Sequence, residues 1–171
     1  MNLVPCRSCG SEVSPEALAC PRCGAPFPAR PSWQGRGFEW RSATTIMGYP
    51  LVHLAIGRTN QGKMLVAKGI IAIGQFAVGV VTIAQFGVGL LFGFGQFILG
   101  FTALAQFAGG LLAGVGQFAT GYVAVGQIVF GYYGLGQAGL CQYLWSVYHK
   151  DPQAVQFFLS LKDTLNQLFD W

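Results

Sequence analysis

Four cysteines near the start of the chain are the residues best suited to chemistry. Cys6 and Cys9 form one C-x2-C pair, Cys20 and Cys23 form a second, and ten residues separate the two pairs. The two residues inside each pair let both sulfurs reach one ion, and four thiolates match the tetrahedral coordination of Zn²⁺. The spacing therefore predicts a structural zinc site held by Cys6, Cys9, Cys20 and Cys23.

The backbone around these cysteines must fold back sharply, and a Gly after each pair permits such a turn. Residues 1–25 resemble a four-Cys zinc ribbon. Because the segment contains little apolar material, we expect the metal to supply its folding energy. Two disulfides in a secreted module are the alternative. The chain begins MNLVPC with no signal-peptide pattern, which favours a reducing cytosol and a cytoplasmic location over secretion.

The residues outside the cysteine pairs argue against an enzyme. A closed four-Cys site leaves no open coordination position, and the sequence offers no acid/base pair and no nucleophile with its base. Residues 1–68 carry eight Lys and Arg against three Glu, a charge that could contact phosphates or anionic lipid. We favour a solvated basic surface on a ribbon that binds a protein partner. Nucleic acid is not an expected partner, because no aromatic residues interleave with the charges.

A five-residue repeat occupies the middle of the chain, as in GIIAI GQFAV GVVTI AQFGV from Gly69. A period of five fits neither the 3.6 of a helix nor the 2 of a plain strand, and it predicts a solenoid of stacked short strands. Six-residue blocks at 89–94 and 110–115 lie 21 residues apart, so we expect four blocks in each coil. On that count Ala84, Ala105 and Gly126 stack in one column, and Gln75, Gln96 and Gln117 stack in another, where their amides could hydrogen-bond from coil to coil.

Residues 69–140 resemble the pentapeptide-repeat β-helix, which is a four-sided solenoid. The resemblance implies that the small residue and the central residue of each block point into the coil. The chain departs from that family at the outward positions, which are apolar here instead of polar. These outward positions include Val78, Ile83, Val88, Leu99 and Leu104. The central residues expected to point inward are Phe76, Val81, Phe86, Leu91, Phe97, Thr102, Phe107, Leu112, Phe118, Val123, Ile128 and Tyr133.

The surface of such a coil has an unusual composition, because residues 69–149 contain no Asp, Glu, Lys or Arg. A large exposed apolar surface marks a membrane or protein interface. With coils about 4.8 Å apart, three and a half coils are roughly 17 Å long, which is short of a hydrocarbon core of about 30 Å. We therefore expect the solenoid to associate with itself or to lie in one leaflet, and not to cross a membrane. Its expected partners are further copies of the chain and membrane lipid.

Transmembrane helices are the alternative for this apolar stretch, which is long enough for three or four spans of about 20 residues. Glycine at every fifth position argues against them, because at 100° per residue it scatters glycines around the whole helix. The stretch also lacks the polar turns and charged loops that separate and orient helical spans. The repeat therefore favours strands over helices.

The segments on either side of the repeat are expected to connect it and to cover its ends. Residues 26–47 are rich in Pro and Gly, contain Trp33 and Trp40, and are predicted to be a linker. Residues 48–68 are predicted to form a hairpin or a first irregular coil, with a packed His53. Residues 141–150 form a junction, and residues 151–171 a capping amphipathic helix that starts at Asp151 and Pro152. The apolar stripe of this helix comprises Ala154, Phe158, Leu161, Leu165 and Leu168, widened by Phe157, Phe169 and Trp171.

The order of parts resembles that of uncharacterised bacterial zinc-ribbon proteins with a hydrophobic Gly-rich repeat, a likeness that implies a bacterial source and brings no activity. The predicted fold is mainly β, namely a four-sided β-solenoid with an N-terminal zinc ribbon and a C-terminal α-helix. The expected function is a non-enzymatic scaffold or self-assembly module whose zinc ribbon binds a partner. The alternative is an integral membrane protein with helical spans and a cytosolic zinc ribbon.

Overall fold

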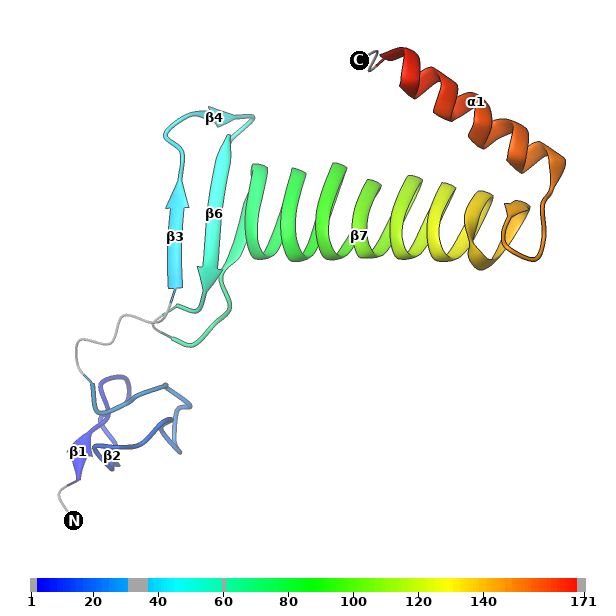
Figure 1. Cartoon of the computed structure of the whole chain (residues 1–171). Coiled ribbons are helices and arrows are strands. Elements are labelled where there is room, and N and C mark those ends of the chain that lie inside the picture. Colours follow the sequence, from blue (N-terminus) through cyan, green and yellow to red (C-terminus); the bar gives the residue numbers. More distant parts are fainter. Residues whose placement is uncertain (1–2, 31–36, 60, 169–171) are drawn as a thin grey trace.

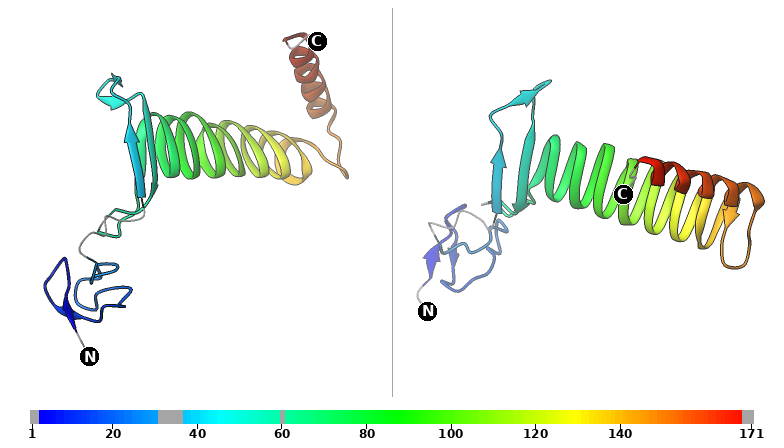
Figure 2. Two further views of the ribbon diagram at one scale, coloured as in Figure 1. Left: turned by 60° about the vertical axis from the view of Figure 1, so that its left-hand side comes forward. Right: turned by 45° about the horizontal axis from the view of Figure 1, so that its top comes forward.

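The fold is mainly β, with one helix at the C-terminus (Figure 1). The computed structural model describes residues 3–30, 37–59 and 61–168. Along the chain it contains a small cysteine-bearing unit, a short sheet, a long coil and the helix α1. Figure 2 shows that the cysteine-bearing unit lies beyond one end of the coil and that α1 leaves the other end.

The cysteine-bearing unit is built on two short antiparallel strands, β1 (Val4–Pro5) and β2 (Glu12–Val13). Its small core consists of Cys6, Val13, Cys20 and Ala25. Backbone pairing continues beyond the boundary predicted at residue 25, because the Arg7 N–H donates to the Pro28 carbonyl at 2.9 Å. The unit therefore extends into the first part of the segment predicted as a linker.

A short sheet occupies the rest of that predicted linker. Strand β3 (Gly37–Arg41) pairs antiparallel with β6 (Val52–Gly57), which places Arg41 opposite His53. Strands β4 (Thr45–Ile46) and β5 (Tyr49–Pro50) form a small hairpin beside it. Trp40 lies in β3, whereas Trp33 is outside the described residues. The linker prediction was wrong for residues 37–47, because every residue of β3 has a strand partner in β6 and β4 pairs with β5.

Strand β6 leads into the coil by parallel pairing. Val52 pairs with Ile71 and Ala55 pairs with Gly74, so β6 runs alongside the first part of β7 (Val66–Trp145) in the same direction. Within residues 48–68 the chain turns back on itself, because Arg58 and Met64 form an isolated antiparallel bridge. The structure therefore combines a short antiparallel turn with the parallel pairing of a first irregular coil.

Strand β7 winds into a regular coil (Figures 1 and 2). Residues ten or eleven apart lie against each other in successive coils, as Gly116 does against Ala105 and Gly126 against Gly116. The rings of Phe76, Phe86, Phe97, Phe107 and Phe118 stack in one ladder, with centroids 4.5–6.1 Å apart. Each coil therefore holds two blocks, and the prediction of four blocks in a 21-residue coil was wrong. The 80 residues of β7 make about seven and a half coils, which at about 4.8 Å each give a length of roughly 36 Å.

The interior of the coil is filled by small side chains. Ala77, Ala108, Ala119 and Ala124 are at most 2% exposed. All twelve central residues predicted to point inward are half-buried or exposed, so that prediction was wrong by one position at Phe76, Phe107, Phe118 and Val123. The physical reason is the short coil, because ten or eleven residues enclose a channel that admits Ala, Gly and Thr but few larger side chains.

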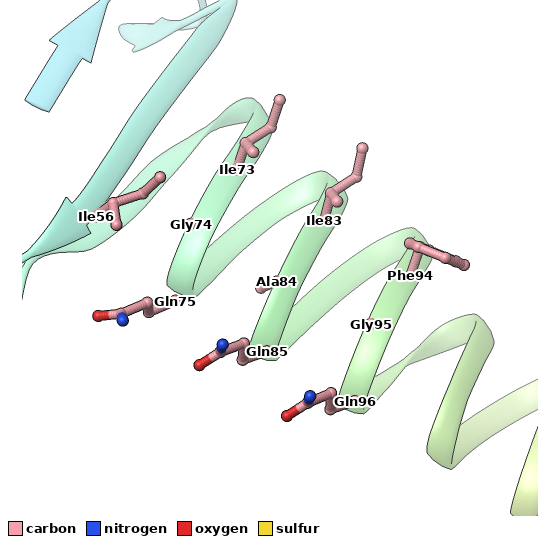
Figure 3. A pocket seen from close by; sticks show the side chains of 10 residues that line it. All are labelled: Ile56, Ile73, Gly74, Gln75, Ile83, Ala84, Gln85, Phe94, Gly95 and Gln96. Carbon is pink, nitrogen blue, oxygen red and sulfur yellow. The ribbon is translucent and has the colours of Figure 1, made fainter. Parts of the chain in front are cut away.

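Gln residues form a single row along the outside of the coil. In Figure 3 the amides of Gln75, Gln85 and Gln96 point away from the ribbon, one per coil. They border a shallow groove that also runs past Ile83 and has small residues such as Ala84 at its floor. The row continues through Gln106, Gln117 and Gln127. The column predicted from the sequence contains Gln75, Gln96 and Gln117 but not the Gln residues between them, which is a consequence of the wrong coil length.

The helix α1 (Pro152–Leu168) begins where the sequence predicted. Asp151 caps it, because Oδ1 accepts a hydrogen bond from the Gln153 N–H at 2.8 Å. Only its first turns pack on the coil, where Phe157 stacks on Tyr133 at 4.1 Å and Phe158 is buried. The later stripe residues Leu161, Leu165 and Leu168 are exposed, and Phe169 and Trp171 lie outside the described residues.

The stretch that the alternative hypothesis assigned to helical spans lies almost entirely within β7. Over the described ranges, the structure contains no helix with the length and apolar character needed to cross a membrane.

Candidate metal centre

Two tight turns present the four cysteines. The N–H of Gly10 donates to the Cys6 carbonyl at 2.9 Å, and the N–H of Gly24 donates to the Cys20 carbonyl at 2.8 Å. Both glycines have positive φ, +74° and +72°, which side chains disfavour. The Gly after each C-x2-C pair therefore closes the turn that brings the two thiols of the pair together.

The four sulfurs form a compact cluster. The Sγ atoms of Cys6 and Cys23 are 3.8 Å apart, those of Cys9 and Cys20 are 3.7 Å apart, and all four lie within 4.8 Å of one another. Metal–sulfur bonds of about 2.3 Å in a tetrahedron place sulfurs about 3.8 Å apart. Disulfide sulfurs are about 2.05 Å apart, so these thiols are free. The structure brings together all four predicted ligands in a geometry that could bind a metal ion.

Ser11 is a neighbour of the cluster that the sequence did not identify. Its Oγ lies 3.0 Å from Cys9 Sγ and 3.3 Å from Cys20 Sγ. The Ser11 hydroxyl and then the backbone N–H of Cys23 lower the pKa of Cys20 to about 6. Hydrogen bonding to the thiolate therefore favours the deprotonated form that binds metal. A Ser two residues after a ligand Cys gives no distinctive sequence signal.

Crowding has the opposite effect on Cys23. The Ala25 N–H lowers its pKa, but the Cys9 thiol, burial and the thiols of Cys20 and Cys6 together raise it to about 12. Four adjacent thiolates repel one another, and a bound divalent cation would neutralise this repulsion. Every protein ligand position of a tetrahedral site is filled by sulfur, so the arrangement suits a structural role.

Arg7, which the sequence offered as a contact for phosphate or anionic lipid, is used inside this unit. Its guanidinium donates to the Pro26 carbonyl at 3.1 Å, and its side chain is half-buried. Arg22 is exposed. Arg7 therefore joins the first cysteine turn to the segment after the second pair.

A second polar cluster lies where the short sheet meets the coil. His53 is 2% exposed, and the Lys68 N–H donates to its Nδ1 at 2.8 Å. In the tautomer that accepts at Nδ1, Nε2 can donate to Glu39 Oε1, which lies 3.2 Å away. The Arg41 guanidinium donates to the same carboxylate at 2.6 Å, and Arg41 Nε lies 3.4 Å from His53 Nε2. His53 is thus a packed, hydrogen-bonded residue. Its partners were missed because residues 39 and 41 were placed in a linker.

Comparisons with protein-family models, curated proteins and solved structures find no match for this chain.

Proposed function

We propose that this chain is a non-enzymatic scaffold. In this proposal a β-solenoid formed by β7 associates with copies of itself and with membrane, and a zinc-stabilised head presents a surface to a protein partner. The observation that carries the proposal is the outside of the coil, where large apolar side chains are exposed from end to end. Leu90, Leu111 and Leu140 are 67%, 76% and 77% exposed. Isolated soluble proteins rarely expose apolar surface over such an area.

The head supports the proposal through its chemistry. Four thiolates at tetrahedral spacing suit Zn²⁺, and a filled site of this type stabilises a fold without catalysing a reaction. The small core around Cys6 and Cys20 contains few apolar residues, so the metal would order the unit and hold its surface in one conformation.

One face of the coil is suited to contact between copies. The Gln row and the stacked Phe ladder run side by side along several coils, for example at Gln106 and Phe107. Amides are both donors and acceptors, so two Gln rows can pair with each other, and flat rings beside them can pack across the same interface. The face is therefore complementary to itself.

The test uses the full-length protein expressed in bacterial cells. We expect it to sediment with membranes, to form oligomers when cross-linked in detergent, and to contain one zinc ion per chain by elemental analysis. A protein that is monomeric and freely soluble in a detergent-free lysate would contradict the association. A chain without bound metal after mild purification would contradict the role of the head.

A further inference from the structure

We propose that β7 crosses a lipid bilayer, with the axis of the coil along the bilayer normal. This inference rests on the association function proposed above and commits its apolar surface to one occupant, the hydrocarbon of the bilayer. It also reverses the expectation from the sequence that the coil is too short to span.

The backbone of a coil meets the strictest requirement of a membrane span. Polar backbone groups in hydrocarbon must be hydrogen-bonded within the protein. In β7 each coil pairs with the next, and β6 continues the pairing at the first coil, where the Ile71 N–H donates to the Leu51 carbonyl at 2.9 Å. The unpaired edges therefore lie at the two ends of the axis. An axis along the normal places both ends in water.

The distribution of side chains in the coil is the reverse of that in a water-soluble fold, because most of the large apolar side chains lie on the outside. Small residues such as Ala108 and Ala119 fill the interior at 0% exposure, together with Ile98 and Val129, while the other large apolar side chains are half-buried or project outward. Large apolar side chains project at several positions around one coil, as Leu104, Phe107 and Leu111 illustrate. Hydrocarbon would cover these apolar sides, whereas the side that carries the Gln row would face the second copy proposed above, where amide can pair with amide.

The length of the coil fits the bilayer. About seven and a half coils measure roughly 36 Å, against about 30 Å for the hydrocarbon core. The charged residues nearest the repeat, Lys68 and Lys150, lie at its two ends, and residues 69–149 between them carry no charge. The corrected coil period is what makes the span long enough.

The aromatic residues follow the order expected across a membrane. From residue 50 to residue 121 the aromatic residues are all Phe, whereas Tyr49 and Trp40 lie near the first coil. At the other end Tyr122, Tyr132, Tyr133 and Tyr143 cluster near Trp145. Tyr and Trp concentrate at membrane–water interfaces, while Phe is common in the hydrocarbon. The coil therefore has two interfacial belts and an apolar middle.

The charges outside the coil give the span a direction. Residues 1–68 carry eight Lys and Arg against three Glu, and residues 150–171 carry two Lys against three Asp. Positive charge stays on the cytoplasmic side of a membrane. The cysteine-bearing head is therefore cytoplasmic, where thiols remain reduced, and the end of the coil from which α1 starts faces the opposite side.

The first test measures orientation. Carbonyl groups in a coil lie along its axis, because the hydrogen bonds join one coil to the next. We expect the strand part of the amide I band to be polarised along the bilayer normal when the full-length protein is reconstituted in oriented phosphatidylethanolamine and phosphatidylglycerol bilayers. Polarisation in the membrane plane would show a coil that lies flat, and would overturn the inference while leaving self-association intact.

The second test places a charge at different depths. Leu111 is near the middle of β7 and Leu140 is near its end, and the two side chains are 76% and 77% exposed. We expect Leu111→Lys to reduce the carbonate-resistant membrane fraction about tenfold or more, and Leu140→Lys to change it less than about twofold, because a Lys near the interface reaches water. Equal effects of the two substitutions would overturn the inference.

The third test separates a spanning coil from one embedded on a single side. Leu99→Lys and Leu104→Lys lie at other exposed positions around the middle of the coil and should reduce the membrane fraction as strongly as Leu111→Lys. A loss of membrane fraction for variants on only one side of the coil would contradict a membrane-spanning coil. A monomeric, soluble wild-type protein would instead contradict the proposed function itself.

Discussion

The cysteine-bearing head and the coil differ in what stabilises them: the head has too small an apolar core, whereas the coil exposes too much apolar surface. The head has a core of four small residues and needs its thiol cluster to hold two turns together. The coil has a continuous backbone ladder and an interior of Ala and Gly, and it exposes more apolar surface than water tolerates. In the head the cysteine side chains hold the fold together. In the coil the backbone ladder holds the fold together, and the outward apolar side chains determine which environment the coil can occupy.

The largest expected difference between the two regions comes from the metal. Structural zinc sites contribute roughly 10–16 kcal/mol of apparent binding free energy in small zinc-finger peptides. We expect Cys20→Ser to abolish zinc binding and to make residues 3–30 sensitive to proteases, with the coil unchanged. Elemental analysis and limited proteolysis would measure the two effects.

Cys141→Ser is the matched control, because Cys141 lies in β7 and its Sγ is 3.7 Å from the Val129 carbonyl oxygen, far along the chain from the cluster. It should retain one zinc ion and a resistant head. A head that stays folded without metal would contradict the comparison drawn above.

A smaller effect is expected inside the coil. Here enlarging a small interior residue should destabilise the fold more than removing a large aromatic one. Ala108→Leu places a large side chain in an interior that is 0% exposed, and overpacking costs about 1–3 kcal/mol. Phe107→Ala, one residue earlier, removes a half-buried outward ring and costs about 0.5–1.5 kcal/mol of stacking per ring pair. Unfolding of both variants by denaturant in detergent would measure the difference. A larger loss for Phe107→Ala would show that the ring, and not the methyl group, belongs to the interior.

The smallest expected effect concerns the polar cluster at the entrance of the coil. The Arg41 guanidinium, first by its hydrogen bond and then by its charge, and His53 hold the pKa of Glu39 below its ordinary value of 4.5. The unfolded chain binds this proton more readily, so the carboxylate stabilises the fold above about pH 4.5, and this contribution is lost as pH falls through the lower folded pKa. Because Glu39 is partly exposed, we expect less than about 1 kcal/mol.

Glu39→Gln tests this contribution directly. In this variant the unfolding free energy of β3 and β6 should fall less on acidification than in the wild type. Amide hydrogen exchange from about pH 6 down to about pH 3, corrected for the intrinsic exchange rate, would measure the difference. An unchanged pH dependence would show that Arg41 and His53 do not act through this carboxylate.

The sequence predicted the head well because its determinants are local. Two residues between thiols and a Gly after each pair define a turn without reference to the rest of the chain, and the structure places Gly10 and Gly24 at positive φ as that pattern requires. Ser11 and the extension to Pro28 depend on contacts between the two turns, and so the spacing alone could not reveal them.

The period of the coil was harder to predict, because a 21-residue recurrence fits one coil of four blocks or two coils of two blocks. The sequence contains the deciding signal. Gln75, Gln85, Gln96 and Gln106 recur at steps of ten or eleven, in every second block, which is the spacing of one coil in the structure. The error changed both the length of the coil and the identity of its interior residues. The Glu39 and His53 contact was missed for another reason, since it depends on the register of β3 with β6.

The coil period also means that the length of β7 is determined by the number of coils. A Cβ at Gly116 would overlap the carbonyl oxygen of Ala105 in the preceding coil, and one at Gly126 would overlap that of Gly116 in turn, so the same close approach is repeated from coil to coil. Because each coil contacts mainly its neighbours, a 21-residue segment could be duplicated or deleted in frame without altering the coils on either side. Each such change would alter the height of the molecule by two coils, or about 10 Å. The number of repeats, each with its close glycine contact to the preceding coil, therefore sets the length of the molecule.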